Sequence, residues 1–228
     1  MEEHQSTNRL KYFSIVSAIF VSVLIISNTI ASKLIQIGPF IVSCAIIVFP
    51  ISYIFGDILT EVYGYKRSRK IIWTAIVCLI FMSLIYWLAG LLPSASIWTN
   101  QEAFLSVLGV VPRITLASIV AYFCGEFSNS YVLAKMKIFT QGKKLWTRTI
   151  GSTVVGEGVD SILFILIAFY GTVPASFLIA AILSGYILKV AYEIIATPIT
   201  YKIVKFLKKE EGIDTYDYET NFNPFKLN

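Results

Sequence analysis

Long, nearly unbroken runs of apolar residues dominate the chain, and short polar segments separate them. Each run is long enough for a helix that crosses a membrane, which needs about 20 residues. The runs lack the alternation of apolar and polar positions that the strands of a membrane barrel show. The pattern therefore predicts an all-α membrane protein with six transmembrane helices, over residues 12–37, 40–63, 68–92, 113–137, 147–171 and 175–204.

Turn-forming residues mark several breaks between these runs. Gly38 and Pro39 separate the first two runs, and Pro93 ends the third. The loop after Pro93 contains a short predicted helix that begins at Asn100 and ends before Pro112, because asparagine caps helices and proline stops them.

Lysine and arginine residues gather in alternate polar segments. Sixteen of the 19 lie in or beside the N-terminus, the second and fourth connections, and the C-terminal end. Cytoplasmic segments of membrane proteins carry such an excess. We therefore expect a cytoplasmic tail over 1–11, a transmembrane domain over 12–204, and a polar, mobile cytoplasmic tail over 205–228. The chain is predicted to be a multi-pass protein of the cytoplasmic membrane.

Composition supports a lipid environment. Hydrophobic residues make up 56% and charged residues 14% of the chain, against about 45–50% and 25% in soluble domains. The isoelectric point is 9.0, but the basic residues flank apolar runs, so they favour membrane orientation over nucleic-acid binding. The three cysteines lie inside apolar runs and His4 is the single histidine. Neither a disulfide framework, a metal site nor another cofactor is expected.

The usual motifs of enzymes are missing from the sequence. There is no Gly-x-Ser-x-Gly elbow, and His4 lies in a polar tail rather than near a nucleophile. Gly151 and Gly156 have the spacing of a phosphate-binding loop, but Glu157 follows where that loop requires lysine. Catalysis is therefore disfavoured, which leaves transport or a structural role.

Eight ionisable residues fall within the apolar runs, which favours transport over a structural role. Each costs at least about 2.5 kcal/mol near the centre of a bilayer, so such residues face the bundle interior or a water-filled cavity. Six are acids and two are bases, so some of the acids are expected to be protonated or paired. The eight are Lys33, Asp57, Glu61, Glu126, Glu157, Asp160, Lys189 and Glu193.

Glu157 and Asp160 form the sharpest candidate pair. Their spacing of three residues places both carboxylates on one face of the fifth predicted helix, near mid-membrane. Gly156 and Gly158 allow close backbone approach there. The pair could bind a ligand, or it could form a salt bridge to Lys189 within a packing seam.

Similar alternatives stay open for the other candidates. Lys189 and Glu193 lie four residues apart, so they either bind a ligand or neutralise each other. Glu126 shares a mid-depth face with Asn129 on the fourth predicted helix. Asn28 is either a ligand-binding residue or a link between helices.

Asp57 and Glu61 lie near the inner end of the second predicted helix. They could serve as an inner gate or a proton acceptor. The alternative is a helix end bridged to the basic residues Lys66 and Arg67. The stretch from Tyr53 to Asp57 also echoes the stretch from Tyr122 to Glu126, which would fit a duplicated parallel unit.

A set of polar and small residues in register from 27 to 201 resembles the queuosine precursor transporter family, which is also grouped with vitamin uptake transporters. The set comprises Ser27-Asn28, Phe49-Pro50, Gly56-Asp57, Thr60-Glu61-Val62-Tyr63-Gly64, Arg69-Lys70, Arg113-Ile114-Thr115, Ala117-Ser118, Ala121-Tyr122, Gly151-Ser152-Thr153, Asp160-Ser161 and Lys189-Val190.

The resemblance implies a six-helix fold like that of the substrate-binding component of energy-coupling-factor transporters. It also implies uptake of a 7-deazaguanine, such as 7-cyano-7-deazaguanine. A carboxylate can accept the paired N–H and amino groups of such a ring, and Asn28 or Lys189 could donate to its carbonyl. The substrate-binding residues would be Asn28, Glu126, Glu157, Asp160, Lys189 and Glu193.

Several features of the transport remain open from the sequence. The alternative function is a substrate-capture subunit for another vitamin-like small molecule, which works with a separate ATPase module. The expected partners are the small-molecule substrate, the lipid bilayer, and either a second copy of the chain or an energising partner. The energy source is not given by any motif.

Overall fold

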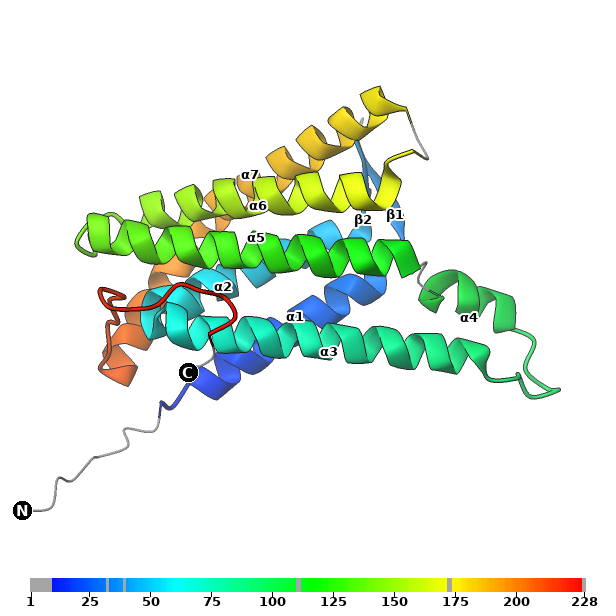
Figure 1. The fold of residues 1–228 in the computed structure, drawn as a ribbon, viewed down its shortest axis with the longest axis horizontal. Helices are drawn as coiled ribbons and strands as arrows, with labels where there is room; N and C mark the ends of the chain where they lie inside the picture. Colours follow the sequence, from blue (N-terminus) through cyan, green and yellow to red (C-terminus); the bar gives the residue numbers. More distant parts are fainter. Residues whose placement is uncertain (1–9, 32, 39, 110–111, 172–173, 227–228) are drawn as a thin grey trace, which may run out of the picture.

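Helices that run along a common axis build most of the molecule (Figure 1). The computed structural model describes residues 10–226 apart from 32, 39, 110–111 and 172–173. The start of α1 and the end of α7 lie at the same end of the bundle, which we call the inner end after the predicted orientation. The helices are α1 (Phe13–Ile30), α2 (Phe49–Tyr63), α3 (Tyr65–Leu91), α4 (Gln101–Leu108), α5 (Pro112–Phe139), α6 (Leu145–Phe169) and α7 (Ala175–Glu211).

Among the described residues, four helices are long and apolar enough to cross a membrane: α1, α3, α6 and most of α7. The chain is therefore a multi-pass membrane protein. The expectation of six spans is confirmed only in this coarser form. Helix α2 has 15 residues, fewer than the roughly 20 that a span needs. Helix α5 is continuous, but polar residues near its middle, including Glu126 and Asn129, interrupt its apolar sequence.

The predictions of a first helix that reaches residue 37 and of one continuous helix over residues 40–63 were wrong. Strands β1 (Leu34–Ile37) and β2 (Phe40–Ser43) form an antiparallel hairpin, and a 3-10 turn, η1 (Cys44–Ile47), precedes α2. Gly38 lies in the turn with a φ of 57°, a conformation that glycine adopts without steric cost. Isoleucine and valine suit a strand, but in sequence they look the same as the apolar residues of a span.

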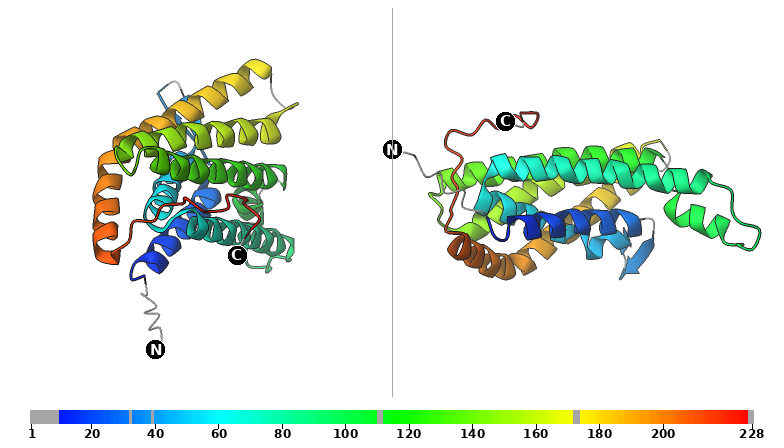
Figure 2. Two further views of the ribbon diagram at one scale, coloured as in Figure 1. Left: turned by 60° about the vertical axis from the view of Figure 1, so that its left-hand side comes forward. Right: turned by 90° about the horizontal axis from the view of Figure 1, so that it is seen from below.

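The last helix also runs further than predicted, because α7 ends at Glu211 rather than near residue 204. Pro198 lies inside it, and a proline cannot donate the helical hydrogen bond of that turn, so a bend is expected there. Figure 2 shows α7 bent in this part and the chain after it running back along the bundle.

The segment after α7, residues 212–226, packs against α3 and α5 rather than extending free. Arg69 donates to the backbone carbonyls of Asn221 and Asn223, both at 2.7 Å. The Trp73 indole donates to the carbonyl of Pro224 at 2.8 Å. The ring of Phe225, which stays largely exposed, also contacts the rings of Trp73 and Phe123. We call residues 212–226 the C-terminal strap.

Glycines set the close contact between α5 and α6. A Cβ on Gly125 would lie 2.8 Å from the Cβ of Asp160 and 3.0 Å from the carbonyl oxygen of Gly156. A Cβ on Gly156 would lie 2.7 Å from the Cβ of Asn129. The predicted close approach at Gly156 is therefore confirmed, and it brings the polar faces of two helices together.

Candidate functional site

Buried polar side chains form a column through the bundle. On α2, Tyr53, Asp57 and Glu61 follow one another at intervals of four residues, so they share one face of the helix. On α7, Lys189 and Glu193 do the same. All five acids closest to this column's centre are less than one-tenth exposed: Asp57, Glu126, Glu157, Asp160 and Glu193. The column is divided below into an outer, a middle and an inner cluster.

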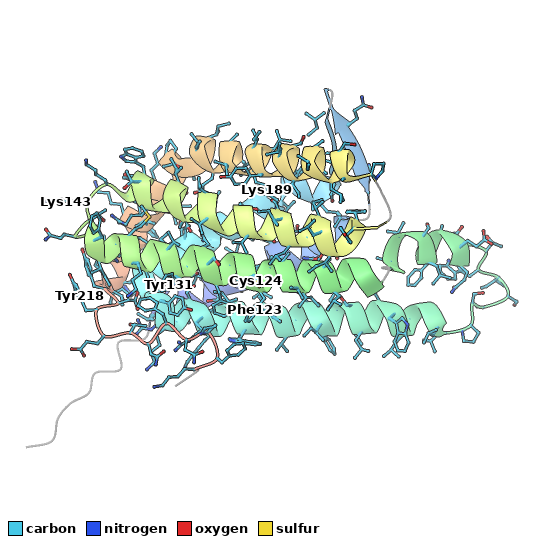
Figure 3. The ribbon with its side chains drawn as sticks, turned by 45° about the horizontal axis from the view of Figure 1, so that its top comes forward. Phe123, Cys124, Tyr131, Lys143, Lys189 and Tyr218 are labelled. Atoms are coloured by element: carbon cyan, nitrogen blue, oxygen red, sulfur yellow. The ribbon has the colours of Figure 1, made fainter. Side chains whose placement is uncertain are left out.

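The outer cluster consists of Glu157, Asp160 and Lys189. The Lys189 Nζ lies 2.6 Å from the Asp160 Oδ2 and 2.8 Å from the Glu157 Oε2. It also lies 4.5 Å from the centre of the Phe49 ring, in a cation–π contact. Figure 3 shows Lys189 on α7 beside α6. The structure therefore contains the salt bridge between Lys189 and the acids of α6, which was one of the two alternatives from the sequence. Glu193, the other candidate partner of Lys189, lies in the next cluster.

Two carboxylates share one ammonium in the outer cluster, so the cluster carries one excess negative charge if both acids are ionised. The Lys189 side chain is 15% exposed, more than either acid beside it. Its three donors cannot be satisfied in an apolar bundle without such partners. The arrangement offers both a donor and acceptors to a polar ligand.

The middle cluster consists of Asp57 on α2 and Asn129 on α5, which are hydrogen-bonded, and of Glu193 on α7, whose carboxylate is the charged group that acts most strongly on Asp57. The Asn129 Nδ2 donates to the Asp57 Oδ1 at 2.7 Å. Within the described part of the chain, the other Asp57 oxygen, the Asn129 Oδ1 and both Glu193 carboxylate oxygens have no hydrogen-bond partner. The three residues are at most 1% exposed.

Glu126 lies between the outer and middle clusters. It is fully buried, and neither of its carboxylate oxygens has a hydrogen-bond partner among the described residues. The hydroxyls of Tyr53 and Tyr122 are likewise buried and unpartnered there. Sequence analysis did not select these tyrosines, although their place in the repeated Tyr-to-acid stretch was a signal.

The inner cluster centres on Glu61. Its Oε1 accepts from the Arg148 Nη2 at 2.7 Å and from Lys208 at 2.6 Å, and its Oε2 accepts from the Arg148 Nε at 3.1 Å. Lys137 donates to the backbone carbonyl of Glu61 at 2.5 Å and forms an ion pair with Asp214.

The alternative of a bridge from Glu61 to the adjacent Lys66 and Arg67 is not found in the described part of the chain, because Glu61 bonds to basic residues of other helices instead. Arg148 comes from α6 and Lys208 from α7. Sequence analysis used these basic residues only for orientation, because spacing along one helix says nothing of cations that another helix brings.

Asn28 lies apart from these clusters. Its Nδ2 donates to the carbonyl of Leu24, one turn back on α1, at 3.0 Å. Its role as a substrate ligand stays a prediction. Lys33, which follows α1 toward the outer end, is exposed, as expected of a lysine that reaches out of the bilayer.

Apolar helices around a buried column of ionisable side chains define a membrane protein with a polar core, a feature typical of transporters. Over residues 43–203 the chain matches the family described as "Putative vitamin uptake transporter". The protein belongs to this family of membrane transporters.

Three relatives have related names. A "Probable queuosine precursor transporter" of Bacillus subtilis (strain 168) is 30% identical over 156 residues, which is 68% of each chain. The "Queuosine precursor transporter" of Escherichia coli (strain K12) is 25% identical over 75% of this chain and 74% of its own. A "Probable queuosine precursor transporter" of Haemophilus influenzae is 27% identical over 54% of this chain and 49% of its own. No solved structure matches.

These findings confirm the resemblance seen in the sequence. The chain is a transporter rather than an enzyme, since the family and these relatives are described as transporters. It is a multi-pass protein of the cell membrane.

Proposed function

We propose that the protein imports a 7-deazaguanine precursor of queuosine across the cytoplasmic membrane. The observation that carries the proposal is the outer cluster, in which Lys189 lies 2.6 Å from Asp160 and 2.8 Å from Glu157. The names of the relatives agree with it.

The chemistry of a 7-deazaguanine ring matches the groups of the outer cluster. Its pairing edge carries an N–H and an amino group side by side, beside a carbonyl oxygen. Asp160 would accept from both donors, and Lys189 would donate to the carbonyl while it keeps its ion pair with Glu157. Phe49, whose ring centre lies 4.5 Å from the lysine nitrogen and 5.7 Å from the centre of the Tyr53 ring, would offer an aromatic face to the flat ligand.

The remaining predicted ligands fit the proposal less directly. Glu126 is buried beside Tyr53 and Tyr122 and has free acceptor oxygens among the described residues, which a ligand amine could use. Glu193 is one turn further in on α7. Asn28 uses one Nδ2 hydrogen for its bond to Leu24, and its second hydrogen could donate to the ligand.

The finer membrane arrangement is part of the same proposal. We infer six crossings, with η1 and α2 together forming the second, and a fold like that of the substrate-binding component of energy-coupling-factor transporters. A homo-oligomer or a separate energising partner would act with this unit.

The test is uptake of labelled 7-cyano-7-deazaguanine by cells that cannot synthesise it, with queuosine in transfer RNA as the readout. Restored queuosine supports the proposal, and its absence despite normal expression contradicts it. Purified protein in proteoliposomes then separates the alternatives, because a capture subunit would bind the ligand but import it only with its ATPase partner.

A further inference from the structure

The middle cluster differs from its two neighbours in its charge balance. Glu157 and Asp160 share Lys189 above it, and Glu61 has Arg148 and Lys208 below it. Among the described residues no lysine or arginine lies within ion-pair distance of Asp57 or Glu193. A bare carboxylate in a low-dielectric interior is costly, and in practice such a group binds a cation or becomes neutral.

Hydrogen bonding in the middle cluster points to the same deficit. Asn129 is uncharged and fully buried, yet only its Nδ2 has a partner in the described structure, and its Oδ1 remains free. Asp57 and Glu193 add three more free oxygens. An ionised carboxylate only accepts, whereas a protonated one donates. One proton on Asp57 or Glu193 would thus supply the donor that this set of acceptors lacks.

A proton fits this place better than a divalent metal. The described residues contain no group of three or more His, Cys, Asp or Glu side chains arranged to hold a metal ion. Two carboxylates and one amide, drawn from three helices, are sufficient to hold and release one proton.

The charged neighbours of Asp57 come from its own helix and from three others. Tyr53 and Glu61 lie one turn away on α2, Glu126 lies on α5, Glu157 and Arg148 lie on α6, and Glu193 and Lys189 lie on α7. Helix α1 has no ionisable side chain, and the basic residues of α3 lie in its first two turns, at the inner end. The charged groups that act most strongly on Asp57 are the acids Glu193, Glu126 and Glu61, and no basic group is among them.

The position of the cluster suggests how it is linked to the ligand. Lys189 and Glu193 lie one turn apart on α7, so they move together. If a ligand takes Asp160 away from Lys189, the resulting shift of α7 acts on Glu193 as well. On α2, Asp57 stands about 6 Å along the axis from Glu61, the centre of the inner cluster.

We propose that the protein is a proton symporter in which Asp57, Asn129 and Glu193 hold the transported proton, separately from the ligand. In each cycle one proton from the outer solution forms an O–H bond on a carboxylate of this cluster. That bond breaks after the inner cluster opens, and the proton leaves to the cytoplasm with the substrate. This inference rests on the proposed function.

Proteoliposomes containing the purified protein test the inference, with 7-cyano-7-deazaguanine as an uncharged probe and the membrane potential clamped. With one proton per substrate, an inward gradient of one pH unit should drive about tenfold accumulation, since one pH unit corresponds to 1.36 kcal/mol. Asp57→Asn and Glu193→Gln should each reduce this accumulation ratio to about one. Asp57→Asn, which changes no predicted substrate ligand, should still bind the probe and exchange it across the membrane. Glu102→Gln, an exposed change on α4, is the matched control and should behave as the wild type.

The outcomes separate the inference from the proposed function. A wild type that does not bind the probe refutes the proposed function. A wild type that binds and transports it without response to the proton gradient, or with a response to sodium instead, overturns the proton site and leaves the function intact. Full accumulation by a folded Asp57→Asn protein or by a folded Glu193→Gln protein also overturns the proposed proton site. Either variant alone is sufficient for this test, so it can be carried out even if the other variant fails to fold.

Discussion

The carboxylate of Glu126 on α5 occupies the space where a Cβ would stand on Gly56 of α2. The converse contact is made by Gly125, where a Cβ would lie 2.6 Å from the Tyr53 hydroxyl of α2. Each glycine makes room for a polar side chain of the other helix. The two similar stretches of sequence, from Tyr53 and from Tyr122, therefore face each other in the core.

Gly56→Ala should destabilise the protein and weaken ligand binding, because the new methyl group displaces the Glu126 carboxylate. Overpacking of this kind costs about 1–3 kcal/mol. Gly185→Ala on α7 is the matched control, since a Cβ there meets no heavy atom within 4 Å. Thermal unfolding in detergent and ligand titration would measure both effects. Equal unfolding temperatures and equal ligand affinities of the two variants would show that the contact between Gly56 and Glu126 does not limit the size of residue 56.

Asp160→Asn should weaken binding of 7-deazaguanines strongly. The change replaces one acceptor oxygen by a donor that opposes the ligand N–H, and it also removes the charge that pairs with Lys189. Loss of one partner of a buried charged hydrogen bond costs roughly 2–5 kcal/mol, or about 30-fold to several-thousand-fold in affinity.

Binding of guanine and adenine analogues to wild type and Asp160→Asn would measure this effect. Adenine, which lacks the paired donors, should compete poorly with 7-deazaguanines for binding to the wild type. Glu210→Gln, an exposed change on α7, controls for the loss of a carboxylate. An unaltered affinity in a folded Asp160→Asn protein would leave Asp160 with a structural role as a partner of Lys189.

The sequence predicts the helical bundle and the buried acids because their physical signals are local. An acid inside an apolar run must face the interior, so Glu126, Glu157 and Asp160 were selected correctly as buried residues. The partners of Glu61 were missed, because Arg148 and Lys208 reach it only through tertiary packing. The hairpin before α2 was missed because hydropathy does not separate a strand of isoleucines from a span.

Glu61→Gln should open or unfold the inner end of the bundle. The substitution leaves Arg148 without its charged partner, and it leaves Lys137 and Lys208 with Asp214 as their one shared acidic partner in the described structure. Removal of one partner from a buried ion pair costs about 3–5 kcal/mol. Chemical unfolding in detergent would measure the loss, and the double variant Glu61→Gln, Arg148→Met should lose less than the sum of the single changes. Additive losses would contradict the coupling.

The orientation of the chain is tested by reporter fusions at loop positions. Fusions after Lys144 and Lys209 should report a cytoplasmic location, and a fusion after Asn100 an external one, because basic segments stay inside. A fusion after Thr172, which lies outside the described residues, should also report an external location. A C-terminus found outside would contradict the predicted arrangement.

Docking of the C-terminal strap should depend on pH through Asp214. Partial burial by itself raises the pKa of the Asp214 carboxyl, but hydrogen bonds from Lys137 and Lys208 outweigh it and hold the pKa below the usual value of 3.8. Since the folded pKa is the lower one, the carboxylate stabilises the docked strap fully above about pH 4. This contribution is lost as the pH falls through the folded pKa.

Pepsin, which is active in acid, should therefore cleave residues 212–226 faster as the pH falls below about 4. Asp214→Asn should show fast cleavage already at pH 5, while Glu219→Gln, an exposed change in the same strap, should follow the wild type. Equal cleavage of all three proteins at pH 5 would contradict the role of Asp214 and assign the docking to the other strap contacts, such as the bonds from Arg69 and Trp73.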